Sequence, residues 1–403
     1  MKDKIEKGER LFFASYGLCL VTSIFYLSMF YQYFIGLPHR IISVFFILLA
    51  VLQELINQKF SLKGFVGVGV CGLLFLLLQR VASGMGHSVT ACICLYVYVA
   101  RNIPFRKIAK FTLLVSGVTM AAVILSGYAG LIPNHVYQSG SRYREFLGFR
   151  YALYPATILF NMTCLYLYIR KRDITLLECG GLVLVNLWMY LKTDARTVFA
   201  VAVVLVAASV VLKYAPRILE KRRVIAWLMI LSFVICAVFS IGLTAAFDRS
   251  SPWMNKLDRA LSGRLSLGQN SLNKYGVTAL GEELSWTGNG LEPDGQEATE
   301  EYDWVDCFYV QILQRYGVIL FAAFLFITAV AMRRFYKDGE IHLMIIMSCI
   351  ALRCILDDLS QYFYLNTFWL AAGIAFYGWF REEMDRVKQR CCPKKKEMAD
   401  GVQ

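Results

Sequence analysis

Twelve apolar segments, each roughly 16–25 residues long and almost free of charged side chains, constrain this chain more than any other feature. A helix of that length spans the hydrocarbon core of a bilayer. Lipid offers the backbone no hydrogen-bond partners, which favours helices, and the alternating segments that a β-barrel needs are absent. We therefore predict an all-α, polytopic transmembrane bundle. The predicted spans are 11–35, 41–57, 64–80, 84–100, 107–129, 150–169, 174–192, 196–214, 224–247, 307–332, 341–356 and 361–380.

The distribution of Lys and Arg predicts the orientation of the spans. With the N-terminus in the cytoplasm, 28 of the 42 basic residues fall in cytoplasmic connections and tails. This two-to-one excess is the positive-inside signal, and it predicts that both termini are cytoplasmic. The clustering of basic residues at span ends also explains the formal charge of +13 without nucleic acid, which we do not expect as a partner.

One long polar interruption divides the predicted spans into two groups. We expect nine spans in 1–247, an extracytoplasmic loop in 248–306, three spans in 307–380 and a basic cytoplasmic tail in 381–403. Loops of this length are usually functional or disordered. Here the charge is segregated, because all charged side chains in 282–306 are acidic, whereas 249–274 carries five basic ones.

The basic half of this loop contains a helix signal. Ser251 and Pro252 are typical of an N-cap and a first helical position. Met254, Leu257 and Leu261 follow at helical spacing. We predict a short amphipathic helix that ends at Gly263 and lies at the membrane surface.

Five arginines lie on the predicted outer side or near the outer ends of spans, against the positive-inside trend. They are Arg150, Arg196, Arg264, Arg315 and Arg353. An arginine at such a depth is costly and is often functional, although it can also extend to the lipid headgroups. Guanidinium groups bind phosphate through paired hydrogen bonds, so converging arginines would form an anion site for a lipid-linked pyrophosphate. Nucleotides are not expected, because the chain has no phosphate-binding glycine loop.

Carboxylates occur at the same predicted level and are candidates for a general base. We select Asp194, Asp303 and Asp306 as candidate catalytic residues. Asp357 and Asp358 lie at the predicted outer turn before the last span, and His135 is a rival base in the shorter outer loop, about 130–149. No Cys/His metal spacing occurs, so neither a metal ion nor another cofactor is expected.

Four stretches resemble motifs of one group of bacterial membrane glycosyltransferases. They are 147–151 (LGFRY) followed by Asn161, 193–197 (TDART), 257–265 (LDRALSGRL), and 288–290 (GNG) followed by 306–309 (DCFY) and 316–317 (YG). In their order and outer placement they resemble the Wzy-type polysaccharide polymerases, which are related to the O-antigen ligase family. Two departures stand out: the loop lacks the histidine of the ligase branch, and Ala195 replaces the usual serine.

The resemblance implies a location and a reaction. The chain would polymerise undecaprenyl-pyrophosphate-linked oligosaccharide repeat units at the outer face of the bacterial plasma membrane, for a capsule, an exopolysaccharide or O-antigen. Arg196 and Arg264, helped by Arg150, would bind the pyrophosphate, and Asp306 would accept the proton of the acceptor hydroxyl. A chain-length regulator and a flippase would be partners.

Three alternatives stay open at this point. A glycan ligase of the same superfamily would use the same donor with another acceptor. A lipid-linked oligosaccharide flippase belongs to a different class, but the halves of the chain show no repeat, and such repeats are common in transporters. A scaffold within a synthesis complex is the third.

Overall fold

The computed structural model describes residues 2–34, 36–81, 84–139, 142–215, 223–288, 290–291 and 301–391, and these residues are mostly helical. In chain order, the elements are α1 (Lys2–Tyr26), α2 (Tyr31–Phe34), α3 (Leu37–Asn57), α4 (Leu62–Gln79), α5 (Gly84–Ala91), α6 (Ile93–Ala100), α7 (Phe105–Tyr128), β1 (Val136–Ser139), β2 (Arg142–Glu145), α8 (Leu153–Arg170), η1 (Lys171–Asp173), α9 (Leu176–Thr193), α10 (Arg196–Tyr214), α11 (Arg223–Ile230), α12 (Ser232–Ala245), α13 (Pro252–Ala260), α14 (Arg264–Tyr275), α15 (Phe308–Lys337), α16 (Ile341–Arg353), η3 (Leu359–Gln361) and α17 (Phe368–Cys391).

Five helices are long and apolar enough to cross a membrane, namely α3, α4, α7, α10 and α15. The pair α11 and α12, bent by 61°, makes a sixth if it counts as one span. The other predicted spans also coincide with helices, but α1, α8, α9 and α17 fall outside the limits of hydropathy and charge, and the apolar helices at Ser88–Ala100 and Ile341–Arg353 are shorter. The structure therefore shows a mostly helical protein of the membrane type, with five or six helices that could cross a bilayer.

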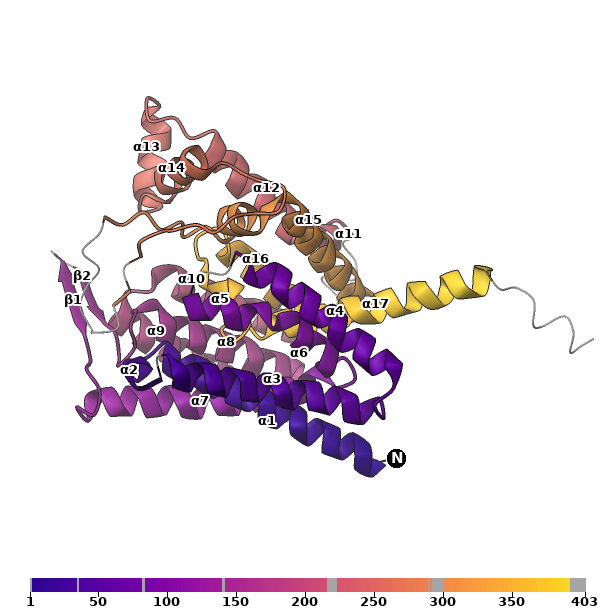
Figure 1. The fold of residues 1–403 in the computed structure, drawn as a ribbon. Helices are drawn as coiled ribbons and strands as arrows, with labels where there is room; N and C mark the ends of the chain where they lie inside the picture. The colour runs from indigo at the N-terminus through magenta and orange to yellow at the C-terminus, as the bar shows by residue number, and fades with distance from the viewer. Residues whose placement is uncertain are drawn as a thin grey trace, which may run out of the picture.

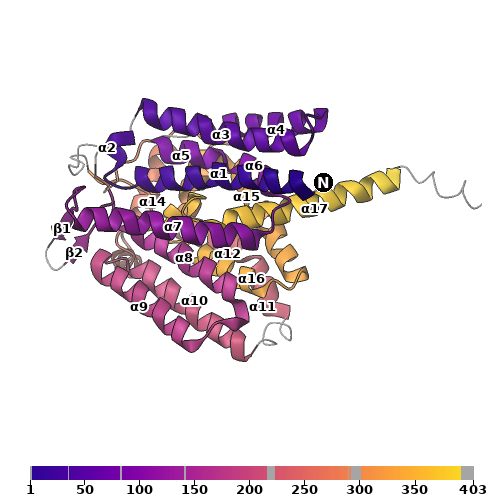
Figure 2. The same ribbon diagram turned by 90° about the horizontal axis from the view of Figure 1, so that it is seen from below.

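The helices form one bundle with two distinct ends (Figures 1 and 2). The hairpin β1–β2 and α2 lie at one end, which we call the loop end. The N-terminus of α1 and the last turns of α17 lie at the other, which we call the terminal end. Each connection between consecutive long helices therefore belongs to one of these two ends.

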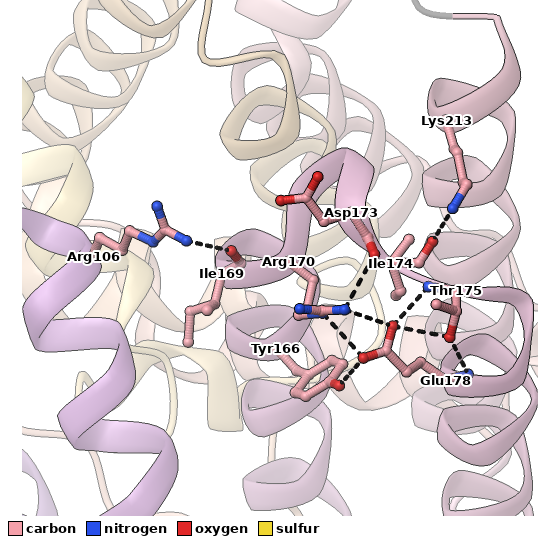
Figure 3. A network of polar contacts seen from close by, with 9 residues as sticks. All are labelled: Arg106, Tyr166, Ile169, Arg170, Asp173, Ile174, Thr175, Glu178 and Lys213. Carbon is pink, nitrogen blue, oxygen red and sulfur yellow. Dashed lines mark hydrogen bonds and ion pairs between the residues drawn. The ribbon is translucent and has the colours of Figure 1, made fainter.

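Side-chain contacts fix the connection between α8 and α9 at the terminal end (Figure 3). Thr175 caps α9 by accepting a hydrogen bond from the Glu178 backbone N–H, and the Glu178 carboxylate accepts one from the Thr175 backbone N–H in return. Tyr166 and Arg170 of α8 donate to the same carboxylate. Lys213 of α10 donates to the Ile174 carbonyl. Three helices are thus joined at one turn.

Two predicted spans have different boundaries in the structure. In the segment predicted at 11–35, α1 ends at Tyr26 and only the short helix α2 follows, because the residues between them pair with the backbone before α8: the Met29 N–H donates to the Gly148 carbonyl at 2.9 Å. The segment predicted at 361–380 becomes helical only at Phe368. The residues before it, 354–367, are an irregular and largely buried connection at the loop end.

The structure also departs from the all-α prediction in the shorter outer loop. Strands β1 and β2 form an antiparallel hairpin in which Val136 pairs with Glu145 and Tyr137 with Arg144. The sequence predicts only an outer loop here, about 130–149, and no strands. The short strands of the hairpin alternate side chains across two faces, so Arg144 and Glu145 project to opposite sides.

Helix α15 is broken at Gly317, where φ is 80° and ψ is 172°. The N–H groups of Val318 and Ile319 donate instead to the carbonyls of Thr278 and Ala279, at 3.1 Å each. The backbones approach so closely that a Cβ on Gly317 would lie 2.3 Å from the Gly281 nitrogen. This break ties the long loop to the bundle at a fixed position.

Candidate functional site

The loop begins with two helices that meet at a sharp corner. The predicted helix is present as α13, but Gly263 is followed at once by a second helix, α14. Gly263 has a φ of 80°, a left-handed conformation that glycine adopts without strain. The Asp258 carboxylate accepts hydrogen bonds from the N–H groups of Leu265 and Ser266, which caps α14. Arg264 is therefore presented at the first position of a capped helix.

Arg264 faces Asp306, which lies just before α15. The Arg264 Nε and the Asp306 Oδ2 are 3.6 Å apart, and the two side chains are 20% and 18% exposed. Tyr302 donates a hydrogen bond of 2.9 Å to the same oxygen. Burial raises the pKa of Asp306, and the positive charge of Arg264 opposes this shift. A carboxylate with a raised pKa is suited to accept a proton near neutral pH.

Arg144 of β2 is a site residue that the sequence did not single out. Its Nε lies 4.0 Å from Asp194 Oδ2, and its positive charge also acts to lower the pKa of Asp306. Within the described part of the chain, the buried Nε atoms of Arg144 and Arg264 have no hydrogen-bond partner. Donors of this kind are costly unless an acceptor such as a phosphate oxygen completes them.

Asp194 and Arg196 complete the group. Asp194 follows the end of α9 with a φ of 49°, and Arg196 is the first residue of α10. The Arg196 Nε lies 2.9 Å from Asp194 Oδ1, although the Arg196 side chain is 67% exposed. Ion pairs join Asp194 to Arg196 and Arg144, and a third joins Asp306 to Arg264. The Arg144 charge acts on Asp306, so we group these five residues and call them the charged row.

The structure does not bring the other three predicted arginines into the charged row. Arg150 donates from Nε and Nη2 to the Leu291 carbonyl, at 3.1 and 2.8 Å, and lies over the Tyr31 ring. Arg315 is buried over the Trp286 ring, 5.1 Å from its centroid. These two guanidinium groups fasten the long loop to the bundle.

Arg353 and Asp303 also have partners of their own. Arg353 donates from Nε to Asp357 at 2.9 Å and from Nη2 to the Thr157 hydroxyl at 2.6 Å. Asp303 accepts from the Thr287 N–H at 2.6 Å and lies 3.5 Å from Lys274 Nζ. Both residues therefore hold neighbouring segments together. His135, the rival base, stacks edge-on against Phe146 beside the hairpin.

The other residues of the LGF and Asn161 motif hold segments of the chain together. Asn161 of α8 donates to the Thr367 hydroxyl at 2.9 Å, and its side-chain oxygen accepts from the Thr367 N–H. Leu147 and Gly148, both with positive φ, form the turn that pairs with residues after α1. Asn289 lies outside the described residues. The LGF and Asn161 motif therefore joins three chain segments at the loop end.

Among the residues that the structure describes, no group of three or more His, Cys, Asp or Glu side chains could hold a metal ion. No protein-family model, curated protein or solved structure matches the chain.

Proposed function

We propose that this chain is a polysaccharide polymerase of the Wzy type, a membrane glycosyltransferase that acts on undecaprenyl-pyrophosphate-linked repeat units. The observation that carries this proposal is the pair of Asp306 and Arg264, with Arg144 beside it. A proton acceptor and two incompletely paired guanidinium groups lie together at the loop end. The resemblance of the four sequence motifs supports the same reaction.

In this reaction, a sugar hydroxyl of the acceptor unit attacks the anomeric carbon of the donor glycan. The new C–O bond forms as the bond between the anomeric carbon and the phosphate oxygen breaks, and the lipid pyrophosphate leaves with the bonding electrons. The hydroxyl proton passes to the carboxylate of Asp306. Arg264 and Arg144 stabilise the negative charge that grows on the pyrophosphate. Arg196, exposed at the edge of the row, makes the first contact with the incoming anion.

The same proposal includes a topology. All twelve helical segments cross the bacterial plasma membrane, both termini are cytoplasmic, and the loop end faces outward. The start of α1 and the last turns of α17 lie at the same end of the bundle, which an even number of crossings requires (Figures 1 and 2). Helix α13, with Trp253, Lys256 and Arg259 exposed, lies at the outer headgroup level, where tryptophan and basic side chains are favourable.

A test in cells separates this function from the alternatives. The chromosomal gene is replaced by a copy that encodes Asp306→Asn or Arg264→Ala. A copy that encodes Arg259→Ala serves as the control, because this substitution removes an exposed charge from the same loop. Polymer length is read from a gel, and lipid-linked units are quantified by mass spectrometry in each leaflet. We expect the two site variants to accumulate single units in the outer leaflet and to lose polymer about 100-fold or more, because each removes a transition-state contact. The control keeps the wild-type ladder.

Three other results would contradict the proposal. A wild-type ladder from both site variants would remove the catalytic role of this pair. Units confined to the inner leaflet would identify a flippase. Polymer of normal length that is not joined to its final acceptor would identify a ligase.

A further inference from the structure

A second carboxyl group, Asp358, is buried in the connection between α16 and α17, and its charge and that of Asp306 act on each other. Its Oδ2 accepts three hydrogen bonds, from Trp304 Nε1 at 3.1 Å, Gln311 Nε2 at 3.2 Å and Gln361 Nε2 at 3.3 Å. These donors come from three segments: the stretch before α15, α15 itself and η3. Asp358 therefore connects the segment that carries Asp306 to the bundle.

The charged groups around Asp358 do not neutralise a negative charge on its carboxylate. Asp306 and Asp357 are the carboxylates whose charge acts on it, and Asp357 is itself paired with Arg353. In the described part of the chain, Asp358 has no ion pair within 4 Å. Four phenols also interact electrostatically with Asp358, those of Tyr151, Tyr154, Tyr302 and Tyr362.

These surroundings favour the protonated form of Asp358. A buried carboxylate without a cation loses solvation, and neighbouring negative charges make ionisation harder still. Burial, followed by the charges of Asp306 and Asp357, raises the pKa of Asp358 to about 7, although the Trp304 and Gln311 donors oppose the shift. Asp306, which has Arg264 beside it, ionises first.

We propose that Asp358 is a positioning residue for the transfer reaction, which in its neutral form holds the Asp306 segment in place and leaves Asp306 as the ionised base next to the pyrophosphate. When Asp358 ionises, it adds a second negative charge that acts on Asp306. That charge weakens the attraction of the charged row for a pyrophosphate. This inference rests on the proposed function, because it concerns the same substrate at the same site.

The sign of the effect follows from the protonation state. Below pH 7, Asp358 is mostly neutral and the anion binds well. If only this form binds, the apparent dissociation constant rises about tenfold between pH 6 and pH 8 for a group that titrates near 7. An asparagine at this position cannot ionise and keeps an oxygen acceptor, so Asp358→Asn removes this rise.

The experiment uses the full-length protein in nanodiscs and undecaprenyl pyrophosphate as the probe, with binding measured at pH 6, 7 and 8. Because the probe itself changes charge in this range, the ratio of the wild-type to the Asp358→Asn dissociation constant is compared at each pH. We expect that ratio to increase about tenfold from pH 6 to pH 8. Asp248→Asn, at an exposed loop carboxylate, is the control and follows the wild type.

A constant ratio would overturn the inference while leaving the proposed function intact. Absence of probe binding at every pH would contradict the proposed function itself. If Asp358→Asn does not fold, the wild type is compared with Gln311→Leu, which removes one hydrogen-bond donor to Asp358. The pH midpoint of binding in this variant should be higher than that of the wild type. An unchanged midpoint in that variant would also overturn the inference.

Discussion

The buried ion pair between Arg353 and Asp357 gives the sharpest prediction about stability. The two side chains are 1% and 6% exposed, and the Arg353 guanidinium also donates to Thr157. Substituting Arg353→Met leaves the Asp357 carboxylate buried without its cation, which costs about 3–5 kcal/mol. Removing both charges in Arg353→Met/Asp357→Leu leaves no unpaired charge, and such replacements are often close to neutral.

The assay is the half-life of the purified protein in detergent at a fixed elevated temperature, followed by tryptophan fluorescence, because large membrane proteins seldom unfold reversibly. We expect the single variant to lose its fold at least ten times faster than the wild type and the double variant to recover most of the loss. A single variant as durable as the wild type, or a double variant no better than the single, would refute this reasoning. If the double variant is as long-lived as the wild type but does not bind pyrophosphate, Arg353 would instead belong to the substrate site.

Two further predictions concern the backbone of the long loop. Gly317→Ala should abolish the monodisperse peak of folded protein in size-exclusion chromatography, because the added Cβ would lie 2.3 Å from the Gly281 nitrogen. Gly339→Ala is the matched control and should fold, because Gly339 also has a positive φ, of 70°, but lies in open space. Asp258→Ala removes the cap of α14 at a cost of about 1 kcal/mol, so hydrogen exchange at Leu265 and Ser266 should accelerate about fivefold, and unchanged exchange would show that this cap contributes nothing.

The positions of the helices were predictable, because an apolar segment long enough to cross a bilayer is compatible with few structures other than a helix. The ends were harder, since they depend on contacts between distant parts of the chain. Nothing local in 27–35 reveals that Met29 pairs with the Gly148 carbonyl and stops α1. Likewise, the break in α15 depends on the carbonyls of Thr278 and Ala279, some forty residues earlier in the sequence.

The candidate site was predictable in part for a related reason. Arg264, Asp306, Asp194 and Arg196 stood out because each is a charge at a predicted outer boundary. The structure joins them in two ion pairs, Arg264 with Asp306 and Arg196 with Asp194. Arg144 was missed because the hairpin that aims it was not recognised. The available signal was the pair of arginines at 142 and 144, which lie in an outer loop against the positive-inside trend.

The different fates of the five arginines could not be read from the sequence. Arg150 and Arg315 lie at the same predicted level as Arg264, but both contact the loop itself. Arg150 donates to the Leu291 carbonyl, and the Arg315 guanidinium packs over the Trp286 ring. A charge at a membrane boundary is equally expensive whether it binds a ligand or fastens a segment. Only the partner atoms in the folded chain distinguish the two uses.

We propose above all that Asp306 and Arg264 carry out glycan transfer from a lipid pyrophosphate. The most direct measurement is polymer formation by the purified protein in liposomes, with lipid-linked repeat units extracted from cells that lack the gene. With the wild type and with Arg259→Ala, we expect a ladder of products and released undecaprenyl pyrophosphate. With Asp306→Asn or Arg264→Ala, we expect this release to be at least 100-fold slower, as the proposal requires. Release at the wild-type rate by either site variant would contradict it.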